Sequence, residues 1–130
     1  VAEAEPDLVT LEFVNDASLQ NPEQFDPVYE DILSRVRALG AELLLITPHF
    51  TRPAMMGFDG LRGKESRGYV LNLRRFAEEN DLALADASAR WEHLWKEGLP
   101  YVTLLRNGIN HPDDRGHALF ADEMMKCFQE

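Results

Sequence analysis

The sequence has 130 residues and lacks a cysteine pair, a long apolar run and an excess of basic residues. Its single cysteine, Cys127, excludes an internal disulfide and a cysteine-based metal cluster, and packing is its expected role. The longest apolar run, at 43–47, is the size of a strand, whereas a membrane span needs roughly 20 residues. Lys and Arg number 13 against 23 Asp and Glu, a net charge of -10. That charge repels nucleic acid and anionic lipid, so neither is an expected partner.

Two further absences narrow the function. No glycine-rich loop follows a predicted strand, so an unrelated domain that binds phosphate or a flavin is the least favoured interpretation, and no cofactor is expected. The chain starts at Val1 without the basic segment and apolar core of a signal peptide. A leader could have been removed together with upstream sequence, so the compartment stays open.

The pattern that is present predicts an α/β fold in one domain, residues 1–130. Hydrophobic residues make up 45% and charged residues 28%, the balance of a globular protein. Three apolar runs, at 7–14, 41–48 and 82–88, read as strands. Helical patterns separate and follow them, as in repeated βαβ units with a parallel sheet.

Three helices are expected from the spacing of their apolar residues. The segment 22–39 ends at Gly40, a good helix stop. The segment 66–81 precedes the third strand, and a last helix runs from about 115 to 128. A long segment at 49–65 has no predicted structure, and such loops are often functional. The residues expected to face the core are Phe25, Val28, Ile32, Val36 and Leu39 in the first helix, Tyr69, Leu73 and Phe76 in the second, and Leu119, Met124 and Phe128 in the third.

Polar residues after the strands are candidates for chemistry, because ligands of open α/β sheets bind outside the carboxyl ends of the strands. Asn15 follows the first strand. Its simpler role is in a turn, with Asp16 capping the next segment; alternatively its side-chain amide stabilises an oxyanion. His49 and Arg52 follow the second strand, and they either line a pocket or lie on a solvated loop.

The segment "NGINHPDDRGH", residues 107–117, combines a helix start with two histidines. Asp113 and Asp114 fit an N-cap and a first helical turn. His111 is not explained by capping, and its pKa range suits a general base at the sheet edge. His117 is expected to pack or cap on the helix. A metal site of His111, Asp113 and His117 is the competing interpretation, but the spacing matches no standard zinc pattern, so no metal is expected.

The fourth histidine, His93, lies in "RWEHLW" beside two tryptophans. A packed or surface position is expected there rather than a catalytic one.

Four segments together resemble the SGNH (GDSL-type) hydrolases, a family of esterases and lipases: "LVTLEFVNDAS", "ELLLITPHFTRP", "LALADASARWEHL" and "NGINHPDDRGHALFADEM". The resemblance implies a flavodoxin-like, three-layer α/β/α fold and the hydrolysis of acyl esters, most commonly acetyl groups on carbohydrates or short-chain esters. It implies that His111 is the general base and Asn15 an oxyanion-hole donor, both catalytic.

Two family features are missing. The family nucleophile lies in a Gly-Asp-Ser motif after its first strand, and none of Ser18, Ser34, Ser66 and Ser88 stands in such a motif. The family's acid stands three residues before the histidine, where this chain has Gly108. Asn107 and Asn110 are nearby but uncharged, and Asp113 and Asp114 are the nearest carboxylates in sequence.

The resemblance therefore covers a C-terminal part that lacks the N-terminal βαβ portion. The strand at 7–14 would then be an exposed edge with two apolar faces, which favours pairing with other polypeptide. We expect a second chain to supply the missing strands, self-association, or a longer enzyme of which this is a fragment. The alternative function is a non-catalytic flavodoxin-like binding or assembly module that pairs through this edge.

Overall fold

The protein is described by a computed structural model that covers residues 2–13, 19–49, 68–108 and 110–128. Three strands form its sheet: β1 (Leu8–Leu11), β2 (Glu42–Ile46) and β3 (Ala83–Ala85). They are parallel and lie in the order β1-β2-β3, with Val9 opposite Leu43 and Leu44 opposite Ala83. All three predicted strands are confirmed, each shorter than its apolar run.

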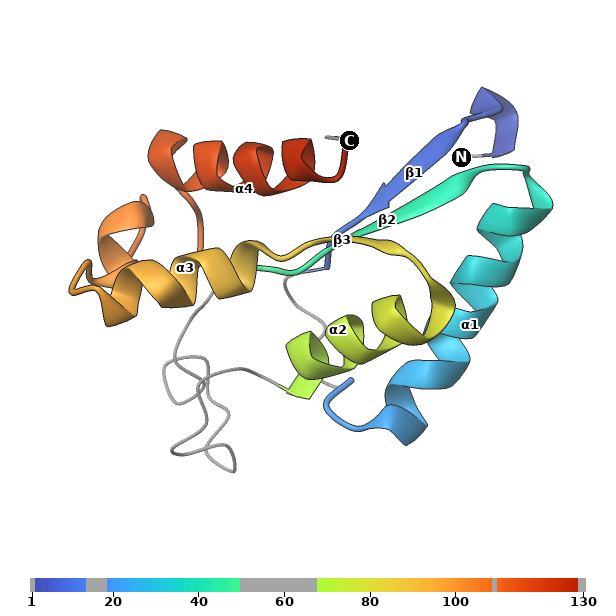
Figure 1. Cartoon of the computed structure of the whole chain (residues 1–130), viewed down its shortest axis with the longest axis horizontal. Helices are drawn as coiled ribbons and strands as arrows, with labels where there is room; N and C mark the ends of the chain where they lie inside the picture. Colours follow the sequence, from blue (N-terminus) through green and yellow to red (C-terminus); the bar gives the residue numbers. More distant parts are fainter. Residues whose placement is uncertain (1, 14–18, 50–67, 109, 129–130) are drawn as a thin grey trace.

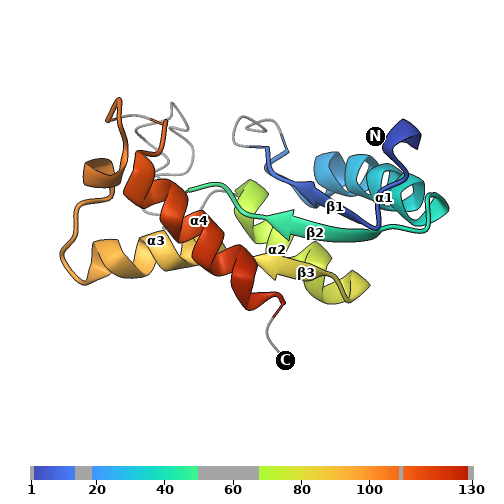
Figure 2. The same cartoon turned by 90° about the horizontal axis from the view of Figure 1, so that it is seen from above.

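Helices lie on both faces of this sheet, which gives the predicted α/β/α layers (Figure 1). Helices α1 (Pro22–Ala38) and α2 (Gly68–Asn80) cover one face, where they pack on Leu43 and Leu45. Helix α4 (Asp114–Lys126) covers the other face, on which Leu44 and Ile46 are buried. Figure 2 shows that α4 lies toward the β3 side of the sheet, away from β1.

A helix that the sequence interpretation missed, α3 (Ala87–Lys96), begins directly after β3. The expected strand at 82–88 ends at Ala85 because Asp86 is an N-cap, whose carboxylate accepts a hydrogen bond from the Ala89 amide. A 3-10 turn at Tyr101–Leu104 then leads toward α4. None of the helices in the described ranges is long and apolar enough to cross a membrane.

The predicted buried face of α1 is partly wrong. Phe25 and Val36 are buried, but Val28 and Leu39 are 43% and 39% exposed, and Ile32 is only partly buried. The helix is rotated because Tyr29 and Leu33 take buried places instead. Tyr29 stacks on Phe25 at a ring distance of 3.9 Å. The residues Val28, Ile32 and Leu39 therefore form a second apolar stripe at the margin of the core, against which Ile32 packs.

The expectations for the other two helices are largely confirmed. Tyr69, Leu73 and Phe76 of α2 are buried. Leu119 and Met124 of α4 are partly buried against the core. Phe128 was expected to face inward, but it is 58% exposed because α4 ends at Lys126, before it. Cys127, the C-cap of α4, packs partly buried against the cluster of Leu44, Ile46 and Ala85. Burial raises the pKa of its thiol, which fits the expected packing role.

Candidate active site

A pocket of about 240 Å³ lies where the carboxyl ends of β1 and β2 meet the start of α4. Glu12 follows β1, while Ile46 and His49 end and follow β2. Asn110 and Pro112, the two neighbours of His111, line the same pocket. The chain therefore brings the segment around His111 to the sheet edge where α/β proteins bind ligands. His117 and Phe120 of α4 complete the lining.

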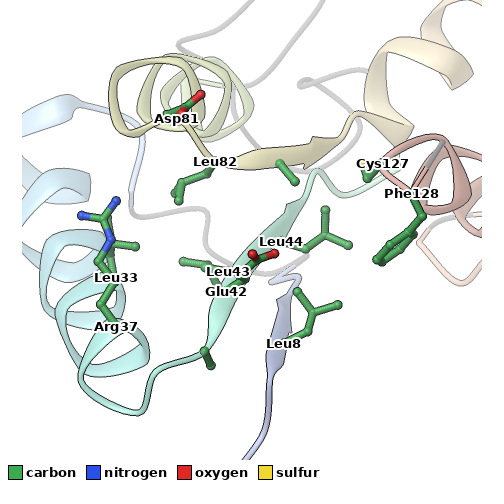
Figure 3. A pocket seen from close by; sticks show the side chains of 12 residues that line it. Leu8, Leu33, Arg37, Glu42, Leu43, Leu44, Asp81, Leu82, Cys127 and Phe128 are labelled. Atoms are coloured by element: carbon green, nitrogen blue, oxygen red, sulfur yellow. The ribbon is translucent and has the colours of Figure 1, made fainter. Parts of the chain in front are cut away.

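A larger cavity, of about 450 Å³, lies at the opposite end of the sheet (Figure 3). Leu8, Glu42 and Ala83, the first residues of the three strands, line it, together with Arg37 and Cys127. We do not assign the chemistry to this cavity, since the amino ends of parallel strands are not the usual ligand edge of such sheets.

The backbone of His111 is fixed on both sides. Its amide donates to Oδ1 of Asn107 at 3.0 Å, and its carbonyl accepts from the Arg106 amide at 2.7 Å. An isolated antiparallel bridge between Leu105 and Pro112 closes the loop. His111 itself is exposed.

Neither aspartate after His111 is arranged as its acid partner. Asp113 is the N-cap of α4: its Oδ1 accepts from the amides of Arg115 and Gly116, both at 3.0 Å. Hydrogen bonds from the Arg115 side chain and the Gly116 amide lower the pKa of this carboxyl despite some desolvation. Asp114 lies 3.5 Å from Arg106 in an exposed ion pair. The predicted helix entrance is confirmed for both residues.

Position 108, where the family has an acid, is a glycine with φ +66°. Among the described residues, no hydrogen bond or ion pair reaches the imidazole of His111. The two nearby asparagines bond to the loop instead: the Asn107 carboxamide holds backbone amides and the Asn110 side chain. Both therefore stabilise the loop rather than the ring.

Several predicted positions fall outside the described residues: Asn15, Asp16, Arg52, Ser18 and Ser66. Of the two described serines, Ser34 lies exposed within α1. Ser88 is buried in the first turn of α3, where its amide donates to the Thr47 hydroxyl. Ser34 does not lie at a strand-to-helix turn. Ser88 follows the turn between β3 and α3, but it is 1% exposed and is therefore not the exposed nucleophile that this class places at such a turn.

His49 is 2% exposed and lies against Trp91, with ring centroids 5.5 Å apart. His49 and Arg52 were expected either to line a pocket or to lie on a solvated loop. His49 lines the pocket, and Arg52 lies outside the described residues. His93 is exposed, which is one of the two positions, packed or surface, expected for it. His117 was expected to pack or cap, but it is exposed on α4 and lines the pocket. The described part of the chain contains no group of three residues placed to hold a metal.

The sequence interpretation missed a polar cluster beside this edge. The Thr47 hydroxyl donates to Asp86 Oδ1 at 2.9 Å, and Arg74 Nε donates to Asp86 Oδ2 at 2.7 Å. Burial raises the pKa of Asp86, but the hydrogen bonds and the Arg74 charge outweigh it, so the pKa is lowered overall. The sequence contained one signal for this cluster: Asp86 in "DAS" precedes a helical pattern, which is typical of a helix N-cap.

The fold places the chain among α/β proteins with a parallel sheet covered by helices on both faces. The solved structure of Axe2, an acetylxylan esterase from Geobacillus stearothermophilus, is similar over 100% of this chain and 63% of its own, with a TM-score of 0.74 and 18% identity. The structure of LAE5, an alpha/beta hydrolase from the metagenome of Lake Arreo in Spain, is similar over 98% of this chain and 62% of its own, with a TM-score of 0.73 and 22% identity.

The sequence matches the GDSL-like Lipase/Acylhydrolase family over residues 1–119, so the chain belongs to this family. The resemblance read from the four segments is thereby confirmed. No curated protein sequence matches the chain. The chain spans less than two thirds of the length of these two solved structures.

Proposed function

We propose that this chain is the histidine-bearing part of an SGNH esterase that hydrolyses acetyl or other short-chain acyl esters. The observation that carries the proposal is the placement of His111: a hydrogen-bonded loop holds it beside a pocket at the ends of β1 and β2. Family membership supports the reaction class.

In the proposed reaction, a serine from polypeptide outside these 130 residues attacks the ester carbonyl. His111 accepts the serine proton and returns it to the leaving alcohol, and water then hydrolyses the acyl-enzyme. The Asn15 side-chain amide donates to the oxyanion, a role of about 3 kcal/mol in related chemistry. No cofactor takes part.

The free edge of β1 supports an external source of the serine. Among the described strands, β1 pairs only with β2, so one side of it is unpaired. A parallel strand added there would end at the same sheet edge as β1, beside Glu12 and the pocket. A serine directly after that strand would therefore arrive on the His111 side of the molecule.

An apolar groove of about 480 Å³ next to β1 supports the same arrangement. Val9 and Leu11 of β1 form one wall, and the second apolar stripe of α1 contributes Ile32 and Leu39 to the other. Such a groove fits the apolar face of a helix that follows or precedes the added strand. The completing segment thus needs a strand and an amphipathic helix, supplied by the same polypeptide or a second chain.

The substrate class is proposed from charge and from the relatives. A net charge of -10 disfavours strongly anionic substrates and leaves neutral esters. Axe2 is an acetylxylan esterase, so acetylated carbohydrates are the first compounds to assay.

The test is hydrolysis of p-nitrophenyl acetate by the chain alone and after fusion to an upstream strand, Gly-Asp-Ser motif and helix. We expect no activity from the chain alone and activity from the fusion, lost again in His111→Ala and in a Gly-Asp-Ala fusion. Activity of the isolated chain that survives His111→Ala would overturn the proposal. Reading the coding sequence upstream of Val1 for an in-frame Gly-Asp-Ser motif tests it independently of the fusion design.

The second candidate is a non-catalytic assembly module, favoured by Gly108 in place of an acid and by the free β1 edge. It predicts a complex through β1 in which His111→Ala changes nothing. Light scattering of the chain with and without the upstream segment separates the two candidates when combined with the ester assay.

A further inference from the structure

The side chain of Asn107 makes three hydrogen bonds to described residues of the loop that carries His111. Its Oδ1 accepts from the amides of Asn110 and His111, both at 3.0 Å. Its Nδ2 donates to Oδ1 of Asn110, also at 3.0 Å. One carboxamide therefore uses both its acceptor and its donor atoms on the residues directly before and at the proposed base.

Backbone hydrogen bonds hold other parts of this loop. The Gly108 amide donates to the Leu105 carbonyl at 3.2 Å, and the left-handed φ of Gly108 turns the chain back. The Arg106 amide bonds to the His111 carbonyl from the opposite strand of the loop. Among the described residues, Asn107 is the acceptor for the His111 amide, so its side chain constrains the backbone from which the imidazole extends.

The hydrogen bond from the His111 amide to Asn107 is important because no described carboxylate holds the ring of His111 in place. In a serine triad, the acid orients the imidazole. Here the observed constraint acts on the backbone of the histidine. We propose that Asn107 is a positioning residue that orients His111 through its amide; this inference rests on the proposed esterase function.

The alignment of a base with its nucleophile is sensitive to small displacements, and an error of about 1 Å costs on the order of 100-fold in rate. Asn107→Ala removes all three bonds. We expect kcat for p-nitrophenyl acetate in the completed esterase to fall about 10- to 100-fold, with KM changed less than two-fold. Asn107→Asp keeps the acceptor for both amides and should retain at least a third of the original kcat.

A second readout is independent of catalysis. In the 130-residue chain, the His111 amide should exchange with solvent about ten-fold faster in Asn107→Ala than in the original protein, and nearly normally in Asn107→Asp. Asn21→Ala is the matched control, because Asn21 is exposed and its side chain makes no cap hydrogen bond. It should leave kcat and the His111 exchange rate unchanged.

The possible outcomes distinguish the positioning role of Asn107 from the proposed esterase function. If His111→Ala abolishes activity while Asn107→Ala keeps full kcat, Asn107 has no positioning role and the esterase proposal stands. Full activity of His111→Ala overturns the esterase proposal itself. If Asn107→Ala fails to fold, Asn107→Asp provides the test. Positioning through the amide is contradicted if Asn107→Asp folds and its His111 amide exchanges normally, but its kcat is below a tenth of the original value.

Discussion

The hydroxyl of Thr47 donates a hydrogen bond to the carboxylate of Asp86 across 39 residues of sequence, at 2.9 Å. This bond ties the carboxyl end of β2 to the start of α3. Asp86 also accepts from Arg74 and caps α3 through the Ala89 amide. The carboxylate thus joins three elements at the edge where His49 and the candidate site lie.

The stability of the protein should depend on the charge of Asp86. The pKa of Asp86 in the folded protein is lowered, whereas an aspartate in an unfolded chain has a pKa of about 3.9. The stabilisation is therefore complete above that pH and is lost as the pH falls toward the folded pKa. Asp86→Asn should lower the free energy of unfolding by about 1–2 kcal/mol at pH 7.

Urea unfolding at several pH values checks this prediction. The difference between Asp86→Asn and the original protein should shrink as the pH drops from 5 to about 3, in the window set by the unfolded and lowered folded pKa values. Asp31→Asn, at an exposed carboxylate paired with Arg35, is the control and should change stability little. A constant difference across that range would contradict the role given to the charge.

Asp113 should act as a cap and not as the acid of the catalytic site. Asp113→Asn keeps an oxygen that can accept from the Gly116 amide, so it should retain activity in the completed esterase. Asp113→Ala should lower Tm by roughly 3–6 °C. Thermal melting and the p-nitrophenyl acetate assay measure the two effects. A large loss of kcat in Asp113→Asn, with normal melting, would instead make Asp113 the acid.

Gly108→Asp should supply an acid at the position where the family has one. The backbone at 108 has φ +66°, which Asp adopts more readily than most residues, and a Cβ there meets no atom within 4 Å. Because removing the acid's charge from a serine protease costs roughly 10⁴-fold, we expect kcat to rise at least ten-fold. Gly108→Ala is the control for backbone strain, and an equal kcat in both variants would show that no acid acts from this position.

Gly116→Ala should disrupt the junction behind the His111 loop. A Cβ at this position would lie 2.7 Å from both the Leu104 carbonyl and the Trp91 ring, and 3.0 Å from Pro112. Overpacking of this kind costs about 1–3 kcal/mol, which urea unfolding would detect. Asp122→Ala, exposed on the same helix, should stay within about 0.5 kcal/mol.

The groove beside β1 should be needed for the completing segment. Leu39→Lys places a charge on the groove wall and should weaken binding of a separately expressed upstream segment by at least ten-fold. Leu71→Lys is the matched control, because Leu71 is 48% exposed on α2 and does not line the groove. Titration calorimetry compares the two, and equal weakening by both would remove the groove from the interface.

Local patterns predicted the parts of this molecule that local physics determines. The three strands follow from runs of apolar residues, and the Asp113 cap follows from its place before a helical pattern. Tertiary contacts decided the rest. The rotation of α1 depends on Tyr29 meeting Tyr69 of α2, with their hydroxyls 2.5 Å apart. The bond between Thr47 and Asp86 exists only because β2 and β3 pair.

Trp91 and Trp95, the only tryptophans of the chain, both lie in α3, and the Trp91 indole donates to the Tyr101 carbonyl. The α1–α2 face of the sheet carries tyrosines instead, Tyr29 and Tyr69. Two of the three tyrosines thus lie on the α1–α2 face, whereas Tyr101 packs with Trp91. Tryptophan emission follows the loosening of α3 from α4, while tyrosine absorbance is weighted toward the opposite face. If the two transitions separate during unfolding, the two layers are distinct cooperative units.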